Sequence, residues 1–174
     1  VDERVPRVPV AESLRERIEL REPREQRQHI RFLQSACRAF ERRWRGIEAK
    51  DRVHPRIAAA AARHATELGK AAMAREILER ALAAEWSPQL LVLYAELPGE
   101  MAEDARTAEA RERIERAESW LLEHARDAQL LAALGRLCAQ AGLWGKARSF
   151  LEASVSFEES RSVYLELARL AERL

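Results

Sequence analysis

The stretch that decides the fold runs from Leu134 to Ser154 and reads LGRLCAQAGLWGKARSFLEAS. Its Gly-Leu-Trp-Gly-Lys run looks like part of a nucleotide-binding loop. A Walker loop, however, needs a glycine, four further residues, Gly-Lys and then a serine or threonine hydroxyl that binds magnesium. Gln140 stands where the first glycine should be and Ala147 where the hydroxyl should be, and no strand pattern precedes them. The stretch therefore predicts a tight corner between two helices, with Gly142 as the left-handed cap of the first helix.

Two segments of the chain, 55–86 and 128–159, carry the same kinds of residue at the same spacing. Each has small residues at positions 8 and 20, where the helices of a tetratricopeptide hairpin cross closely, and a glycine at the turn. With Pro55 and Ala128 at position 1, the matched residues are Ala62 with Gly135, Gly69 with Gly142, Ala74 with Ala147 and Leu78 with Leu151. We therefore expect an all-α fold: a tetratricopeptide-like, right-handed superhelix of antiparallel helical hairpins with an N-terminal helical extension.

The helical pattern divides the chain into an N-terminal extension, residues 1–50, and a repeat array, residues 51–174. In the extension, apolar residues recur at helical spacing between Pro23 and Arg45, which predicts one long helix packing on the array with Pro23 at its first turn. Residues 1–20 are left open between a short helix and partial disorder. The units of the array are expected at about 55–86, 87–126, 128–159 and, truncated, 161–174.

The second unit of the array is degenerate. Pro98-Gly99 and the acidic residues after it predict a loop, and residues 110–127 predict the second helix, with Ala117 and Leu121 where it crosses the first. Glutamate and arginine alternate between Glu103 and Glu118, which favours a solvated helix face with ion pairs four residues apart.

Composition excludes several classes of protein. The chain has 174 residues, of which 47% are hydrophobic and 34% charged, and its net charge of +1 gives no reason to expect nucleic acid as a partner. No apolar run approaches the roughly 20 residues that span a bilayer. The two cysteines, Cys37 and Cys138, lie far apart without metal-ligand spacing and are expected to be packed free thiols. Because the chain begins at Val1 and stops at Leu174 inside a helical pattern, we expect it to be a soluble piece of a longer protein.

A candidate binding site follows from the repeat register. The first helix of each hairpin lines the concave groove, and position 9 of that helix is arginine in three units and Glu96 in the degenerate one. The candidate groove residues are Arg63, Arg136, Arg169, Gln129 and Gln140. Arginine forms bidentate bonds with carboxylates, so an acidic segment, a C-terminal carboxylate or a porphyrin propionate are all admissible ligands. Two alternatives remain. The three arginines at position 9, which we call the basic ladder, could recur by chance in an arginine-rich chain, or they could form ion pairs with Glu67 and Glu172.

The residues from Ala117 to Leu174 resemble the C-terminal tetratricopeptide region of the proteobacterial HemY-type haem-biosynthesis membrane proteins. The most specific strings are Leu-Gly-Arg-Leu-Cys at 134–138 and Leu-Trp-Gly-Lys-Ala-Arg at 143–148. FERRWRGIEAKDRVHPRIAAAAARHATELG at 40–69 and EWSPQLLVLYAEL at 85–97 are similar too, so the likeness covers Phe40 to Leu174. Before the third unit the usual HPDDP is here HARDA, which removes two prolines from the start of that helix.

This resemblance implies an inner-membrane parent with two N-terminal transmembrane helices outside this sequence, followed by this repeat region, and a link to late protohaem synthesis. An even number of such helices favours the cytoplasmic side for the repeat region if the N-terminus is inside. The resemblance supplies no catalytic residues, and the sequence suggests no metal site and no enzyme. We expect a scaffold whose groove holds a protein partner, one of the haem-pathway enzymes. The alternative is direct binding or transfer of haem or a porphyrin intermediate. No cofactor is otherwise expected; a haem would take His64 or Cys138 as axial ligand. The four tryptophans are expected to pack in the core.

Overall fold

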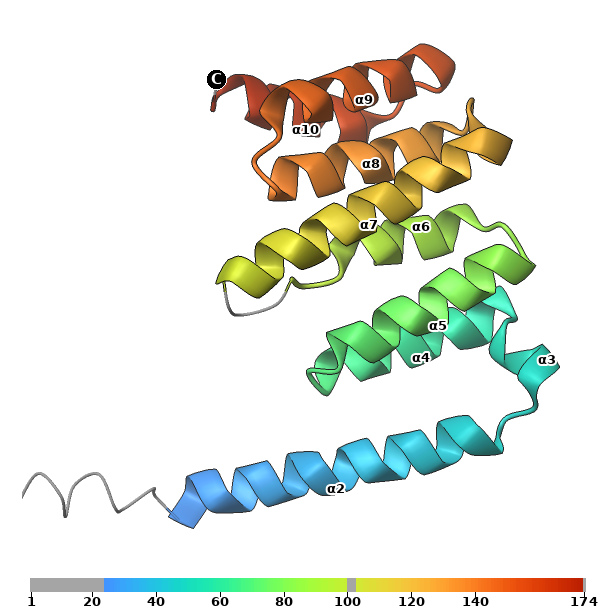
Figure 1. Cartoon of the computed structure of the whole chain (residues 1–174), viewed down its shortest axis with the longest axis vertical. Coiled ribbons are helices and arrows are strands. Elements are labelled where there is room, and N and C mark those ends of the chain that lie inside the picture. Colours follow the sequence, from blue (N-terminus) through green and yellow to red (C-terminus); the bar gives the residue numbers. More distant parts are fainter. Residues whose placement is uncertain (1–23, 100–102, 174) are drawn as a thin grey trace, which may run out of the picture. The chain divides into compact units, whose positions relative to one another are not determined.

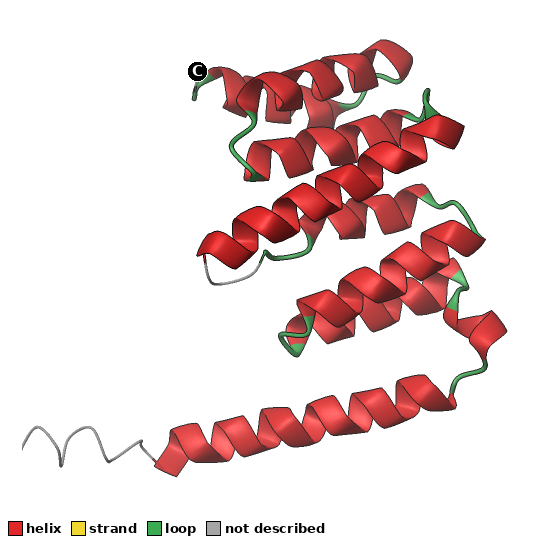
Figure 2. Cartoon of the chain, viewed as in Figure 1, coloured by secondary structure: helices red, strands yellow, loops and turns green. Residues whose placement is uncertain are grey.

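The computed structural model of the chain describes residues 24–99 and 103–173, apart from the side chains of residues 24–26 and 103–106. The described part contains nine helices and no strand, which confirms the all-α class (Figures 1 and 2). The chain divides into two compact units, Val1–Arg42 and Arg43–Leu174, and each is described by itself. The expectations for residues 1–20 and for Pro23 lie outside the described residues.

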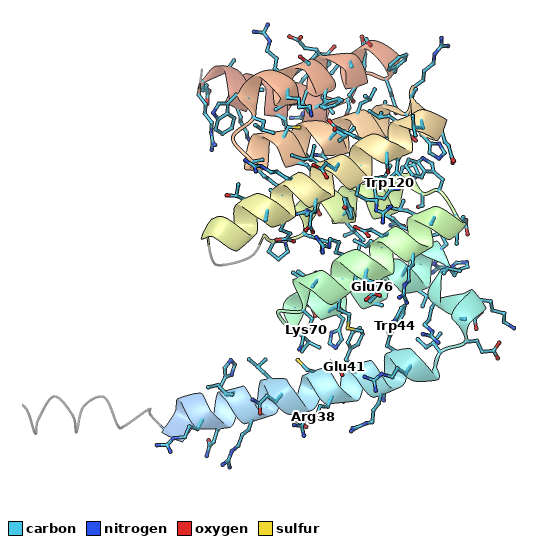
Figure 3. All side chains as sticks on the ribbon, viewed as in Figure 1. Arg38, Glu41, Trp44, Lys70, Glu76 and Trp120 are labelled. Atoms are coloured by element: carbon cyan, nitrogen blue, oxygen red, sulfur yellow. The ribbon has the colours of Figure 1, made fainter. Side chains whose placement is uncertain are left out.

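Helix α2, Arg24–Gly46, crosses the boundary between the two units and confirms the long helix expected near the N-terminus. It is amphipathic: Figure 3 shows Arg38 and Trp44 leaving the helix on opposite sides. Arg43 and Arg45 lie in its last turn, where a positive charge is favourable next to the exposed carbonyl groups. That this helix packs on the array stays a prediction.

The second unit repeats a three-helix arrangement. Helices α4, α5 and α6 start at Pro55, Ala71 and Pro88, and helices α8, α9 and α10 start 73 residues later in each case. Helices that contact each other in this unit are mostly neighbours along the chain (Figure 1). The bounds are α3 Ala49–Arg52, α4 Pro55–Glu67, α5 Ala71–Ala84, α6 Pro88–Glu96, α7 Glu103–His124, α8 Ala128–Gln140, α9 Trp144–Phe157 and α10 Arg161–Ala171.

Glycine makes the tight turn in both matching hairpins. Gly69 and Gly142 have φ values of 71° and 73°, in the left-handed region that residues with a Cβ avoid. Behind Gly142 the N–H of Leu143 donates to the carbonyl of Cys138 at 2.8 Å, and the N–H of Lys70 makes the same bond in the first hairpin. This pattern satisfies the last carbonyls of the first helix and turns the chain back. The predicted cap at Gly142 is confirmed.

The crossing of α8 and α9 depends on Gly135. A Cβ built on this residue would lie 2.6 Å from both Cγ and Cδ2 of Leu151 and 3.3 Å from the carbonyl oxygen of Ala147. Leu151 and Ala147 are both buried. The backbone of α8 at Gly135 therefore lies directly against the Leu151 side chain of α9. Ser154 Oγ also donates to the Ala128 carbonyl at 2.8 Å, which fastens the far end of the same hairpin.

Replacing Gly135 with alanine is expected to destabilise the protein. The added methyl must displace the buried Leu151, and such overpacking costs about 1–3 kcal/mol, which exceeds the gain of about 1 kcal/mol in helix propensity. Gly145 is a matched control because it lies in α9 with open space around its Cα. Urea unfolding followed by circular dichroism should show a lower free energy of unfolding for Gly135→Ala and no decrease for Gly145→Ala. Equal effects would contradict a close crossing.

In the middle hairpin, an arginine of the second helix bonds to the carbonyls at the end of the first. The Tyr94 carbonyl of α6 would accept from the N–H four residues on, but that residue is Pro98, which has none. Arg113 of α7 supplies the missing donor: Nη2 bonds to the Tyr94 carbonyl at 2.5 Å and Nη1 to the Leu97 carbonyl at 3.1 Å. Its guanidinium lies 5.6 Å from the centre of the Tyr94 ring. Only 3% of Arg113 is exposed.

The expected solvated face of α7 is therefore wrong at Arg113, whose pKa is lowered because burial disfavours its charged form. Helix α7 also forms ion pairs with other helices. Glu112 pairs with Arg75 of α5 at 3.3 Å, and Glu118 pairs with Lys146 of α9 at 2.5 Å. Helix α7 begins at Glu103, seven residues before the expected start, so Glu103 and Asp104 belong to the helix, whereas residues 100–102 lie outside the described residues.

Arg113→Met is expected to lower the free energy of unfolding by about 1–3 kcal/mol. Two buried carbonyls lose their donors, and relief from burying a charge offsets part of that cost. Arg111→Met is the control, because Arg111 is exposed on the same helix. Urea midpoints of the two variants should separate clearly. If they coincide, the cap on α6 does not contribute to stability.

Candidate binding groove

Two neighbouring pockets lie over the first helices of the hairpins. The C-terminal pocket, of about 400 Å³, is lined from α6, α8, α9 and α10. The N-terminal pocket, of about 300 Å³, is lined from α4 and α6 and by Leu97. Glu96, at the end of α6, lines both. The two pockets therefore follow each other along one surface of the second unit, and we refer to them together as the groove.

Most of the predicted groove residues line these pockets. Arg136, Gln140 and Arg169 come together in the C-terminal pocket, and Arg63 lines the N-terminal pocket. Gln129 lines neither of the two. It lies half-buried in the first turn of α8, where its backbone N–H donates a hydrogen bond to the capping Asp127 carboxylate at 2.9 Å.

Two of these side chains already have partners within the chain. Arg136 Nε donates to Glu166 Oε1 at 2.7 Å, and the two side chains are only 19% and 22% exposed, so solvent screens the pair weakly. Gln140 Nε2 donates to the Ala95 carbonyl at 2.8 Å. The glutamate that pairs with Arg136 is thus neither Glu67 nor Glu172, the two expected from the sequence. Glu67 instead contacts His64 at 3.2 Å. The basic ladder is therefore partly neutralised by the chain itself.

The groove also contains residues that the sequence register did not single out. Trp144 lines the C-terminal pocket, with the Arg173 guanidinium 5.6 Å from its ring centre. Glu166, Arg169 and Arg173 follow at three- and four-residue intervals on α10 and just beyond it, which puts them on one helix face. That spacing was visible in the sequence, whereas the contact between Trp144 and Arg173 depends on how α9 and α10 meet. Among the described residues, Arg63 and Arg169 have no ion-pair partner.

Aromatic side chains away from the groove connect α6, α7 and α8. Trp86 stacks on His124 with ring centres 3.7 Å apart and contacts Trp120 edge-on at 5.8 Å; Trp120 is labelled in Figure 3. Trp86 Nε1 donates to Asp127 at 2.7 Å, the same carboxylate that caps α8. Tyr94 packs edge-on against Trp120 at 5.2 Å. This cluster fixes the start of α8 relative to α7.

The residues suggested as haem ligands do not line the groove pockets. Cys138 is wholly buried beside the α8–α9 crossing, and burial raises the pKa of its thiol to about 11. His64 is exposed on α4 and contacts Glu67. Within the described ranges, no group of three or more His, Cys, Asp and Glu residues is placed to hold a metal ion. None of the helices described is both long and apolar enough to cross a bilayer.

Cys138 is expected to be unreactive in the folded protein. A pKa near 11 in place of 9.0 leaves about 100-fold less thiolate at pH 8, and the thiolate is the reactive form. In a Cys37→Ser variant, Ellman's reagent should not react with the native protein within minutes and should react fully after unfolding in urea. Rapid reaction in the native state at pH 8 would mean that Cys138 is accessible after all.

The chain matches no protein-family model, no curated protein and no solved structure. The resemblance to the HemY-type region stays an expectation from the sequence, drawn above all from residues 134–138 and 143–148. Residues 134–138 lie in α8 at the close crossing, and residues 143–148 form the start of α9. Both strings thus lie where the geometry of the third hairpin is set.

Proposed function

We propose that residues 51–174 form a tetratricopeptide-like right-handed superhelix whose groove holds a protein partner. The starts of α4 and α6 are 33 residues apart, as are those of α8 and α10, close to the 34-residue tetratricopeptide period. The middle unit, from α6 to α8, is longer at 40 residues. Two glycine turns of the same geometry and the crossing at Gly135 support the same assignment.

The observation that carries the function is the pair of adjoining pockets that share Glu96. Together they extend over α4, α6, α8 and α10, and their linings mix charged side chains with apolar ones. Such an extended, open surface suits a peptide or a protein segment that makes many separate contacts. Arginine and tryptophan, which both line the C-terminal pocket, are the residue types that contribute most to protein interfaces.

We further propose, from the sequence resemblance, that the region belongs to a membrane-anchored protein associated with protohaem biosynthesis. Its partner would then be a late enzyme of that pathway, held close to the bilayer by transmembrane helices outside this sequence. The proposed role is non-enzymatic, because the resemblance supplies no catalytic residues.

The rival function in the same groove is the handling of haem or a porphyrin. Arg136 and Arg169 could bind propionates, and the Trp144 ring offers one flat wall. Neither histidine nor cysteine is among the described residues lining the two pockets, so an axial ligand would have to come from elsewhere. This favours the protein partner.

A titration with haem and with protoporphyrin IX separates the two functions. We expect weak, non-saturating changes in the Soret band that are the same for the wild type and for Arg63→Ala/Arg136→Ala/Arg169→Ala. The same triple variant should weaken binding to a purified late haem-pathway enzyme by at least tenfold, because three groove cations are lost. Saturable one-to-one tetrapyrrole binding that the triple variant abolishes would instead make the groove a tetrapyrrole site.

A further inference from the structure

We propose that the C-terminal pocket is a carboxylate-binding site for an acidic segment of the partner, and that Glu166 occupies this site when the partner is absent. The inference rests on the proposed function, since it names the chemistry of the partner. It assigns three roles: Arg136 and Arg169 bind carboxylates, Trp144 and Leu170 contact the neighbouring apolar group, and Glu166 competes for Arg136.

The chain's own ion pair shows that the pocket accepts a carboxylate. Glu166 reaches from α10 to Arg136 on α8, and the 2.7 Å contact is a charge-assisted hydrogen bond. Both side chains are about four-fifths buried, so an arginine left alone here would lose hydration without compensation. A partner carboxylate that displaces Glu166 restores the bond to Arg136 and releases Glu166 to water.

Arg169 provides the attraction that Glu166 does not cancel. It lines the same pocket and is exposed, and it has no ion-pair partner among the described residues. Arg173 adds a second positive charge beside it, over the Trp144 ring. A carboxylate arriving from solvent therefore meets Arg169 first and Arg136 second, which suits an exchange with Glu166.

The pocket also selects the type of anion. Three arginines and two glutamates line it, so its net charge is only +1. Glu96, which stays in the pocket when Glu166 is displaced, would repel a doubly charged phosphate more strongly than a singly charged carboxylate. The floor is apolar, with Leu151 and Leu170 almost fully buried. The fitting ligand is thus a peptide in which aspartate or glutamate stands next to a large aliphatic residue.

Carboxylate binding by the C-terminal pocket can be tested by fluorescence anisotropy with a fluorescein-labelled, amidated peptide of three Glu-Leu-Ser repeats. A matched control peptide has glutamine in place of each glutamate. Glu166→Gln removes the competing charge and should tighten binding of the acidic peptide about three- to tenfold, a typical effect for one ion pair. Arg169→Gln should weaken it by a similar factor. The glutamine peptide should bind more weakly to the wild type and respond to neither substitution.

The pair Arg148 and Glu152 on α9 supplies matched controls. It is an Arg–Glu pair of nearly the same length, 2.8 Å, but both side chains are more than half exposed and neither lines the pocket. Glu152→Gln and Arg148→Gln change the net charge as the test variants do. Circular dichroism of all four variants confirms that they are folded.

The proposal is overturned if Glu166→Gln and Glu152→Gln act alike, because the effect is then one of net charge. It is also overturned if the acidic peptide does not bind Glu166→Gln at millimolar concentration. Either result leaves the scaffold function to be judged by the triple variant and the purified enzyme. If the acidic peptide responds as expected but no haem-pathway enzyme binds, the carboxylate site stands and the proposed partner is wrong.

Discussion

The close approach of α8 and α9 at Gly135 is the constraint on which the groove depends. With no Cβ at this position, Leu151 can lie directly against the backbone of α8, and its other side forms part of the pocket floor. The same packing brings Trp144, at the start of α9, to the pocket wall. Gly135 thus permits the close approach of α8 and α9, and the Leu151 side chain packed against it also lines the pocket.

The features that could be predicted from sequence are those fixed by local chemistry. A left-handed cap requires glycine, so Gly142 was identifiable without knowledge of the fold. The small residues at the crossings were identifiable because two segments repeat them at the same offset. The end of α6 was not, because the lack of an N–H at Pro98 is visible in the sequence but the donor that replaces it, Arg113, comes from the next helix.

The groove shows the same limit. The repeat register placed Arg136 and Arg169 at one surface, and the structure brings both into one pocket. Which arginine is paired could not be read from the register, because Glu166 and Arg136 are thirty residues apart and belong to different helices. Other glutamates lie closer to Arg136 along the sequence, and only the packing of α10 on the hairpin determines that Glu166 is its partner.

In the proposed site, the Glu166 carboxylate would keep the largely buried Arg136 paired when no partner is bound. Exchange of Glu166 for a partner carboxylate replaces one charge-assisted hydrogen bond with another, so that bond adds little net free energy. Affinity then comes mainly from Arg169 and from apolar contact with Trp144 and Leu170. In the proposed site, such an exchange would make binding of an acidic segment reversible, and the neighbouring side chain would decide the selectivity.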